Sequence, residues 1–251
     1  MDPRAAIMKA IVLAAGLGTR LGVLTNEIPK PLLDIGGRTI LGHILSQLAA
    51  AGFVDVAINL PHHAQKIRDH VGDGRRFGLR VMYSTEEHLL GTAGGARKML
   101  DLFEPALGPA PAPILVHYGD VVTDQDLGLL WQAHLHNHLH KDASATLLLH
   151  RRRGSNSVVE VDSSNRILSL EERPAKLRTE EHWVHSGISV VEAELLCSVP
   201  LGAAADLPKD VYIPALKRGS SLLGHPLEGN RIAVDSAERL AEARKQPWRS
   251  P

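Results

Sequence analysis

Cysteine is nearly absent from this sequence, since Cys197 is the only one in 251 residues. An intrachain disulfide is therefore impossible, and a zinc site built from several cysteines is excluded. An excess of positive charge is also missing, because 28 Lys+Arg balance 28 Asp+Glu. Proteins that coat nucleic acid normally carry surplus Lys and Arg to meet the phosphate backbone, so we expect no nucleic-acid partner.

Long apolar runs are missing too. None approaches the roughly 18–20 residues that cross a bilayer, and the opening Met1-Asp2-Pro3-Arg4 does not resemble a signal peptide. We therefore expect a cytoplasmic protein with no membrane partner. What is present is ordinary for a globular chain, with 44% hydrophobic and 22% charged residues. The length suits one large domain or two small ones.

The first half of the sequence alternates apolar runs with helical patterns. Residues 7–15, 54–60, 79–84 and 113–118 are predicted strands, and residues 39–51, 61–72 and 92–103 are predicted helices. Strands that alternate with helices of this length indicate an α/β fold, with a mostly parallel sheet covered on both faces.

The second half is richer in strands. Residues 143–150, 158–161, 167–170, 183–191 and 231–235 are predicted strands, and residues 162–165 are a predicted hairpin turn. Helical stretches are expected near 192–197, 209–217 and up to Ala243. We interpret the whole as one domain with a β-rich lobe.

The clearest motif is a glycine loop directly after the first strand. Gly16 and Gly18 allow the backbone to turn sharply, so that the amides from Leu13, Ala14 and Ala15 through Thr19 can surround phosphate oxygens. Leu21 stands where a dinucleotide fingerprint needs glycine, and Asn59-Leu60 offers no acidic residue for a ribose. Arg20 and, between two prolines, Lys30 are candidate phosphate contacts.

Together, these residues resemble the sugar nucleotidyltransferase family. The family signature is a strand, a G-x-G-T-R-L loop and then P-K-P-L, and residues 16–21 and 29–32 match it. The resemblance implies a Rossmann-like three-layer domain with a mixed, mostly parallel sheet and a small β-rich sugar-binding lobe. It implies a single domain over residues 1–251, with a nucleotide-binding half at about 8–125 and a sugar-phosphate-binding half at about 126–245. It also implies that Arg20 stabilises the leaving pyrophosphate and that Lys30 contacts the phosphates being joined.

Two further segments match the family in the first half. Residues 86–95 are similar to E-x-x-P-L-G-T-A-G, which implies base binding by Glu86, Gly91, Thr92 and Ala93, with Leu89 in place of proline. Thr92 is also a candidate helix N-cap. Tyr118-Gly119-Asp120 follows the strand at 113–118, where open α/β sheets bind ligands. The resemblance makes Asp120 a Mg²⁺ ligand and places Tyr118 against the substrate.

The sugar side carries departures from the family pattern. Glu172 and Arg173 fall on the E-K-P segment and are expected to bind the sugar phosphate, although arginine and lysine are not equivalent there. His185 and Gly187 fall on N-x-G-I, with histidine in place of asparagine. The alternative is that His185 is a partly buried structural histidine.

The second metal ligand of the family is displaced in this sequence. Residues 231–240 look like W-x-D-I-G-T-P-E-D-L, and the usual metal aspartate falls on Ala233. Asp235-Ser236 resembles a variant found in branches that act on inositol phosphate or phosphocholine. We predict that Asp235 is the second Mg²⁺ ligand; otherwise one carboxylate, phosphate oxygens and water hold the ion.

A run of histidines is a competing metal site. His134 and His138, and likewise His136 and His140, would share a helix face and could chelate zinc. Because no carboxylate or water-activating partner is suitably spaced in the sequence, we expect this run not to bind a functional metal.

The resemblance thus implies an enzyme that joins a nucleoside triphosphate to a sugar 1-phosphate or a related cyclitol phosphate and releases pyrophosphate, with Mg²⁺ as cofactor. GTP is slightly favoured by residues 86–95. One alternative is a cytidylyltransferase of an alcohol phosphate, and another is a non-catalytic regulatory subunit that binds nucleotide sugars. The family also leaves a homo-oligomer open.

Overall fold

Parallel strands form the first half of the molecule. The computed structural model describes residues 7–16, 21–22, 24–61, 64–103, 112–172, 174 and 178–248. Its first four strands are β1 (Lys9–Leu13), β2 (Asp55–Pro61), β3 (Arg80–Glu86) and β4 (Pro113–Tyr118). β1 pairs in parallel with both β2 and β4, and β2 pairs in parallel with β3. The central strands are buried on both faces, which explains their continuous apolar sequences.

The second half extends the same sheet and makes it mixed. β6 (Ala143–Arg152), β9 (His182–Glu192) and β10 (Ser221–Pro226) complete the order β10-β6-β9-β4-β1-β2-β3. β9 is antiparallel to both β4 and β6, whereas β10 is parallel to β6. The predicted α/β fold with a mixed, mostly parallel sheet is therefore confirmed, and β10 is a strand that the sequence pattern did not indicate.

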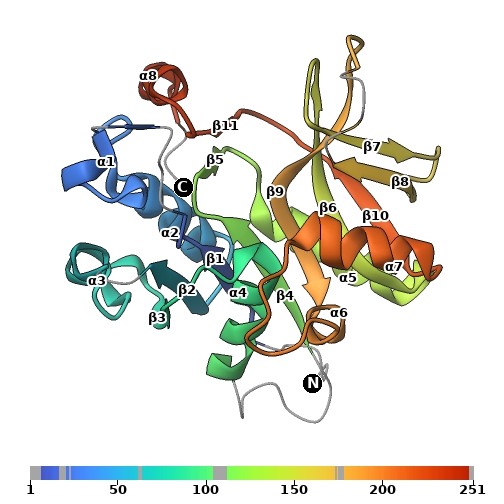
Figure 1. Cartoon of the computed structure of the whole chain (residues 1–251), viewed down its shortest axis with the longest axis horizontal. Helices are drawn as coiled ribbons and strands as arrows, with labels where there is room; N and C mark the ends of the chain where they lie inside the picture. Colours follow the sequence, from blue (N-terminus) through green and yellow to red (C-terminus); the bar gives the residue numbers. More distant parts are fainter. Residues whose placement is uncertain are drawn as a thin grey trace.

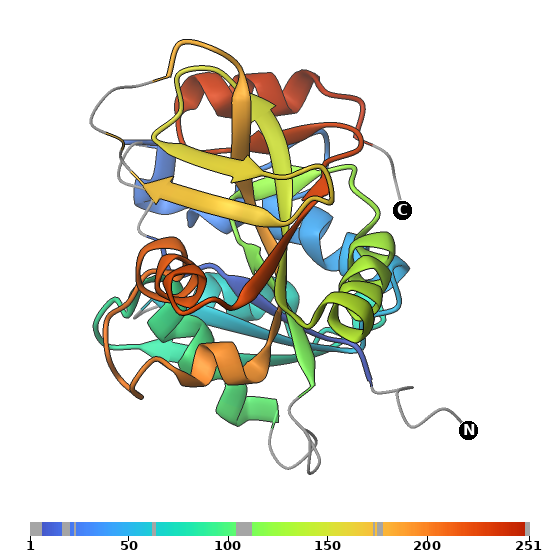
Figure 2. The same ribbon diagram turned by 90° about the vertical axis from the view of Figure 1, so that its right-hand side faces the viewer.

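The β-rich lobe contains the predicted hairpin. β7 (Ser157–Val161) and β8 (Ile167–Glu172) pair in antiparallel fashion and project beside β9 and β10 (Figures 1 and 2). In the turn, Asp162 Oδ1 accepts hydrogen bonds from the amides of Ser164 and Arg166, at 2.8 and 3.0 Å. Asn165 adopts a φ of 64°, a conformation that asparagine tolerates better than most residues.

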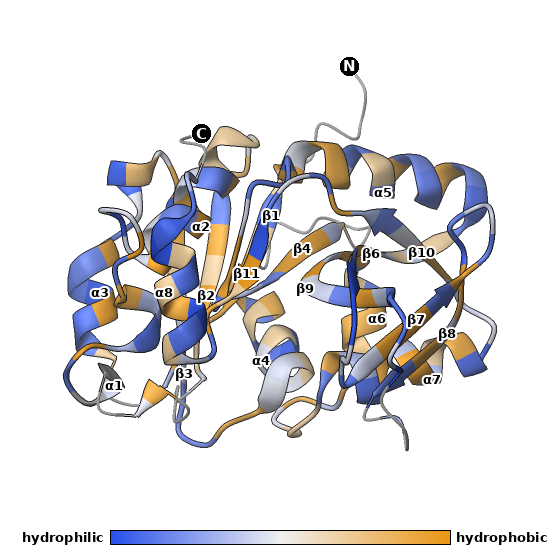
Figure 3. Ribbon diagram, turned by 90° about the horizontal axis from the view of Figure 1, so that it is seen from above, coloured by the Kyte–Doolittle hydropathy of each residue, from blue (hydrophilic) through white to orange (hydrophobic). Residues whose placement is uncertain are grey.

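Helices cover the sheet on both faces and create two hydrophobic cores. Alternation along β1 supplies both of them, because Ala10 and Val12 belong to one core and Ile11 to the other. Figure 3 shows the apolar strands running between the helices. The first core is covered by α2 (Ile40–Ala50), α3 (Gln65–Val71), α5 (Leu127–Lys141) and α8 (Ala237–Lys245). The second is covered by α4 (Gly91–Leu100), α6 (Ala193–Cys197), the π-helix η5 (Leu207–Tyr212) and α7 (Ile213–Lys217).

Short elements fill the connections. They are α1 (Leu24–Glu27), η2 (Lys30–Leu32), η3 (Arg75–Phe77), η4 (Asp101–Phe103), β5 (Val121–Thr123) and β11 (Arg231–Ala233). β5 and β11 form a separate antiparallel ribbon, in which Arg231 lies opposite Thr123. Among the described residues, no helix combines the length and apolar character needed to cross a membrane.

Candidate active site

A pocket of about 290 Å³ opens at the carboxyl ends of the parallel strands. The chain passes from β1 through β2 to β3 on one side and then returns to form β4 on the other side of β1. At such a switch point the loops after two neighbouring strands diverge and leave a crevice for a ligand. We call this cavity the switch-point pocket; it is lined by Leu13, Ala14, Ala15, Gly16, Lys30, Pro31, Asn59, Glu86, Leu89, Gly91, Thr92, Tyr118, Gly119, Asp120 and Asp206.

The pocket brings together the predicted residues from every first-half motif. The glycine loop, the proline-flanked lysine, the segment at 86–95 and the Tyr118-Gly119-Asp120 motif all contribute lining residues. Gly18, Thr19 and Arg20, together with Arg173, lie outside the described residues. Convergence of separate motifs on one cavity at the sheet's switch point is the geometry expected of a ligand site.

Lys30 and Asp120 meet inside this pocket. Lys30 Nζ lies 2.6 Å from Asp120 Oδ2, although the two residues are 90 positions apart. Pro29 precedes Lys30 and Pro31 is buried, so the lysine is held by a short 3₁₀ turn of restricted backbone. The side chains are 12% and 32% exposed. The predicted phosphate contact and the predicted metal ligand therefore neutralise each other here, and a bound phosphate or cation would compete for either partner.

Asn59 connects the ends of three strands. Its Oδ1 accepts hydrogen bonds from the Ala14 and Ala15 amides, at 2.6 and 3.3 Å, and its Nδ2 donates to Glu86 Oε1 at 2.7 Å. Glu86 Oε2 in turn accepts the Leu90 amide at 3.0 Å. The sequence suggested that the Ala14 and Ala15 amides would surround phosphate; instead Asn59 engages them. The feature of the sequence that could have indicated this role is the position of a polar residue, Asn59, near the end of a buried apolar strand.

Thr92 has a different role from the predicted N-cap. Helix α4 begins at Gly91, its N-cap position is Leu90, and no side chain caps it. The Thr92 hydroxyl instead donates to Asp206 Oδ2 at 3.0 Å and accepts the Leu207 amide at 2.7 Å. The cap prediction was wrong because a partner distant in sequence took the hydroxyl. Asp206, which sequence reasoning missed, enters the pocket through this contact.

Ala93 faces the protein. It is buried, and its amide donates to Ala205 O at 2.9 Å. Gly91 has a φ of +69°, and a Cβ there would clash with the Ala205 carbonyl oxygen. The small residues of this segment therefore permit close packing of α4 on the chain before η5, in addition to any approach to a base.

His185 and Gly187 lie behind Tyr118. The His185 ring packs edge-on against Tyr118, with centroids 6.0 Å apart, and a Cβ on Gly187 would lie 3.0 Å from Tyr118 Cδ2. Burial lowers the pKa of His185 to about 4, so the ring is neutral at physiological pH. Neither residue lines the switch-point pocket, and the geometry fits the alternative of a buried structural histidine that supports Tyr118.

Glu172 and Asp235 also lie outside the pocket lining. Glu172 is exposed at the end of β8. Asp235 is brought next to Asp120 by the backbone, because the Val234 amide donates to the Asp120 carbonyl at 2.8 Å. Within the described residues, no three His, Cys, Asp or Glu side chains form a metal-binding group. One or two carboxylates are nevertheless what Mg²⁺ uses when substrate phosphates and water complete its shell, so the chain fits an ion shared with a nucleotide.

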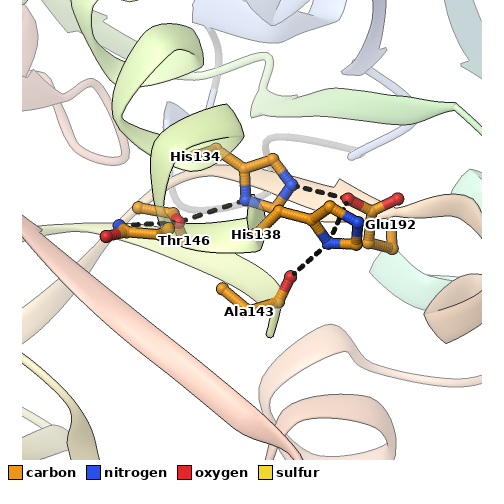
Figure 4. Close-up of polar contacts among 6 residues, drawn as sticks. His134, His138, Ala143, Thr146 and Glu192 are labelled. Carbon is orange, nitrogen blue, oxygen red and sulfur yellow. Dashed lines mark hydrogen bonds and ion pairs between the residues drawn. The ribbon is translucent and has the colours of Figure 1, made fainter. Parts of the chain in front are cut away.

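The histidine run forms a structural network on α5, away from the pocket. His134 is buried; its Nδ1 lies 3.1 Å from Thr146 Oγ1 and its Nε2 lies 3.0 Å from Glu192 Oε1 (Figure 4). His138 Nδ1 contacts the same carboxylate at 3.1 Å and Ala143 O at 3.0 Å. The carboxylate partner, Glu192, comes from β9 and is 58 positions from His134, so spacing along the sequence did not indicate it. Both nitrogens of His134 are occupied by protein groups, which ties α5 to the sheet.

Comparison with known proteins assigns the chain to a family. The sequence profile of the family named Nucleotidyl transferase matches residues 9–230. An N-acetylmuramate alpha-1-phosphate uridylyltransferase of Neisseria meningitidis serogroup B is 34% identical over 245 residues, covering 94% of this chain and 96% of that protein. This chain therefore belongs to the nucleotidyl transferase family, and the family resemblance seen in its motifs is confirmed.

Two longer relatives also match. A UTP--glucose-1-phosphate uridylyltransferase of Synechocystis and a mannose-1-phosphate guanylyltransferase of Mycobacterium tuberculosis are each 32% identical over 82% of the chain. The chain spans only about half their length, 54% and 55%.

Solved structures share the fold. HddC from Yersinia pseudotuberculosis, complexed with GMP-PN, has a TM-score of 0.75 at 21% identity and covers 95% of this chain and 99% of that one. A Bacillus anthracis protein provisionally assigned as a glucose-1-phosphate thymidylyltransferase, in complex with a sucrose, has a TM-score of 0.80 at 21% identity and covers 96% and 97%.

Proposed function

We propose that this chain is a sugar-1-phosphate nucleotidyltransferase. It would join a nucleoside triphosphate to a sugar 1-phosphate and release pyrophosphate. The observation that carries the proposal is the meeting of Lys30 and Asp120, at 2.6 Å, in the pocket formed by the loops after β1 and β4. The relatives' names, which specify sugar-1-phosphate substrates and three different nucleotides, support the reaction class.

The reaction needs positioning more than proton transfer. An oxygen of the sugar phosphate attacks the α-phosphorus of the triphosphate in line, a new P–O bond forms, and the bond from the α-phosphorus to pyrophosphate breaks. Because the attacking group is already an anion, no general base is required. The protein has to hold two polyanions together and offset their repulsion.

Lys30 and Asp120 divide this task. In the proposed mechanism the Lys30 ammonium leaves Asp120 for a phosphate oxygen at the reacting centre, where it offsets the charge that builds up. Asp120, with Asp235 beside it, would hold Mg²⁺. When bound, that ion would supply positive charge that offsets the negative charge of the phosphates. Arg20, as the family motif implies, would stabilise the departing pyrophosphate.

The nucleobase would lie against the ends of β2 and β3. Asn59 and Glu86 fix the glycine loop to the start of α4, so the base and the triphosphate are held by one connected hydrogen-bonded group. The segment at 86–95 favours GTP, whereas the relative that matches nearly the full chain is named as a uridylyltransferase. GTP and UTP are therefore the two nucleotides to compare first.

The test is a matrix of GTP, UTP, dTTP, CTP and ATP against sugar and cyclitol phosphates, with release of pyrophosphate as the readout. We expect one nucleotide to be preferred with a sugar 1-phosphate, and release to depend on both substrates. Activity confined to CTP with an alcohol phosphate would instead identify a cytidylyltransferase. Binding of nucleotide sugars without any turnover would identify a regulatory protein.

A further inference from the structure

Arg231 is a partly buried cation at the junction of the two halves of the molecule. It begins β11, opposite Thr123 of β5, and its side chain crosses to β9. There its Nε and Nη2 donate to the Ser186 carbonyl oxygen, at 3.2 and 3.0 Å. Ser186 directly precedes Gly187, which packs on the pocket residue Tyr118. Arg231 therefore lies between the switch-point pocket and the β-rich lobe.

This guanidinium forms no ion pair with the described part of the chain. Its hydrogen-bond acceptor there is a neutral carbonyl oxygen. Burying a guanidinium without a carboxylate partner is costly, and a hydrophobic side chain of similar size would bridge β11 and β9 at lower cost. The arrangement is thus poorly explained by stability alone.

The neighbouring histidines are neutral, and the Arg231 guanidinium keeps its positive charge. His150 Nδ1 contacts Ser186 Oγ at 3.0 Å, and burial together with the charge of Arg231 lowers the pKa of His150 to about 3. His185 is likewise neutral. Burial lowers the pKa of Arg231 to about 10, which leaves it protonated at neutral pH, while the negative charges of Asp120 and Asp235 oppose this shift. Arg152 adds a second positive charge close enough to act on Arg231.

We propose that Arg231 binds an anionic group of the sugar substrate, either its phosphate or a carboxylate on the ring, and so helps to decide which sugar phosphates are accepted. This inference rests on the proposed function. Its basis is the position of a charged fork of donors on β11, whose partner strand β5 begins directly after Asp120, and the hydrogen bonds of this fork to Ser186 of β9. A guanidinium suits either anion, because both present two oxygens to its parallel N–H groups.

The experiment compares steady-state kinetics of the wild type with Arg231→Gln and Arg231→Lys. Glutamine retains a donor for the Ser186 carbonyl but removes the charge, whereas lysine retains the charge but not the fork. Arg76→Met, which removes an exposed arginine on η3, is the matched control. We expect Arg231→Gln to raise the KM for the sugar phosphate about tenfold or more, with little change in the KM for the nucleotide. We expect a smaller rise for Arg231→Lys and none for Arg76→Met.

Two acceptors identify which anion is bound. N-acetylglucosamine 1-phosphate and N-acetylmuramate 1-phosphate differ only in a carboxylate-bearing lactyl ether. An equal rise in KM for both would assign Arg231 to the phosphate, and a rise confined to the second would assign it to the carboxylate. Unchanged KM values for both acceptors in Arg231→Gln would overturn the proposal. An equal rise in the KM for the nucleotide and the KM for the sugar phosphate would also overturn it.

Folding and turnover are controlled separately. Circular dichroism shows whether each variant is folded, and if Arg231→Gln does not fold, the KM values of Arg231→Lys decide by the same criteria. If the wild type turns over no pair of substrates, the proposed function fails on its own. Calorimetric titration of the two sugar phosphates into wild type and variant, with a non-hydrolysable triphosphate present, then tests Arg231: weaker binding to the variant supports its role, and equal binding overturns it.

Discussion

Single side chains with distant partners decide the geometry of this site. Asn59 shows this best, since it holds the first residues of the glycine loop on one side and Glu86 on the other. Sequence reasoning used Asn59 only to show that an acidic ribose ligand is missing there, and did not predict its role. A residue's partner across strands depends on sheet order and register, which local sequence does not encode. The same reason explains why Asp206 and Glu192 were missed.

Removing the Asn59 side chain should therefore affect both stability and activity. We expect Asn59→Ala to lower the free energy of unfolding by about 1–3 kcal/mol, because buried amide and carboxylate groups lose their partner. We also expect a rise in the KM for the nucleotide, since the loop after β1 is released. Chemical denaturation and steady-state kinetics measure the two effects.

Asn156→Ala, on an exposed asparagine, is the matched control and should change neither quantity. Wild-type stability and nucleotide KM in Asn59→Ala would show that the loop is held by other contacts.

Lys30 offers a second test at the residue scale. Because its ammonium lies 2.6 Å from Asp120 and is expected to move onto a phosphate, Lys30→Met should lower kcat strongly, by about 100-fold if it contributes as other preorganised cations do. Lys98→Met is the control, since Lys98 is a partly exposed residue of α4 whose ammonium donates to the Thr85 carbonyl oxygen. A kcat within about twofold of wild type would remove Lys30 from the mechanism.

Whole elements were predictable where burial imposes a simple pattern. The strands β1, β2 and β4 could be predicted because both of their faces are buried, which makes their sequences apolar. The β7–β8 hairpin could be predicted because Asp162 and Asn165 mark its turn. β5, with three residues, is too short to show a period, and its pairing with β11 depends on the two halves meeting. β11 also ends at Ala233, two residues before the predicted end of this strand at Asp235.

Helix α4 carries a prediction of its own. Replacing glycine by alanine inside a helix usually stabilises it by roughly 0.5–1 kcal/mol. Gly95 should behave in the opposite way, because a Cβ there would lie 2.8 Å from Glu86 Oε1 and 2.9 Å from Asn59 Nδ2. We expect Gly95→Ala to lower the midpoint of thermal unfolding and to weaken nucleotide binding. A higher midpoint with normal binding would contradict the close packing described here.

At the scale of the whole molecule, buried neutral histidines make stability depend on pH. The pKa of His185 is lowered to about 4 and that of His150 to about 3, chiefly by burial. Between those values and about 6.5 the unfolded chain binds protons that the folded chain does not, so stability rises with pH in this window and is lost as the pH falls. Each histidine should contribute a slope of about 1.4 kcal/mol per pH unit.

Denaturant unfolding between pH 4 and pH 7 measures this slope. His150→Asn should make it shallower, whereas replacing the exposed His136 should not alter it. A slope unchanged in His150→Asn would show that His150 is not neutral in the folded protein.

Asp120 is the residue on which the proposed mechanism depends most, because it lines the pocket, contacts Lys30 and is joined through its backbone to the segment that leads to Asp235. The most direct measurement is release of pyrophosphate by Asp120→Asn, with both substrates and Mg²⁺ present. The control is Asp101→Asn, which changes an exposed aspartate that pairs with Arg97 one helical turn earlier. We predict that Asp120→Asn loses turnover by about 1,000-fold or more while remaining folded, and that the control keeps wild-type activity. Near-normal turnover by folded Asp120→Asn would contradict the central claim.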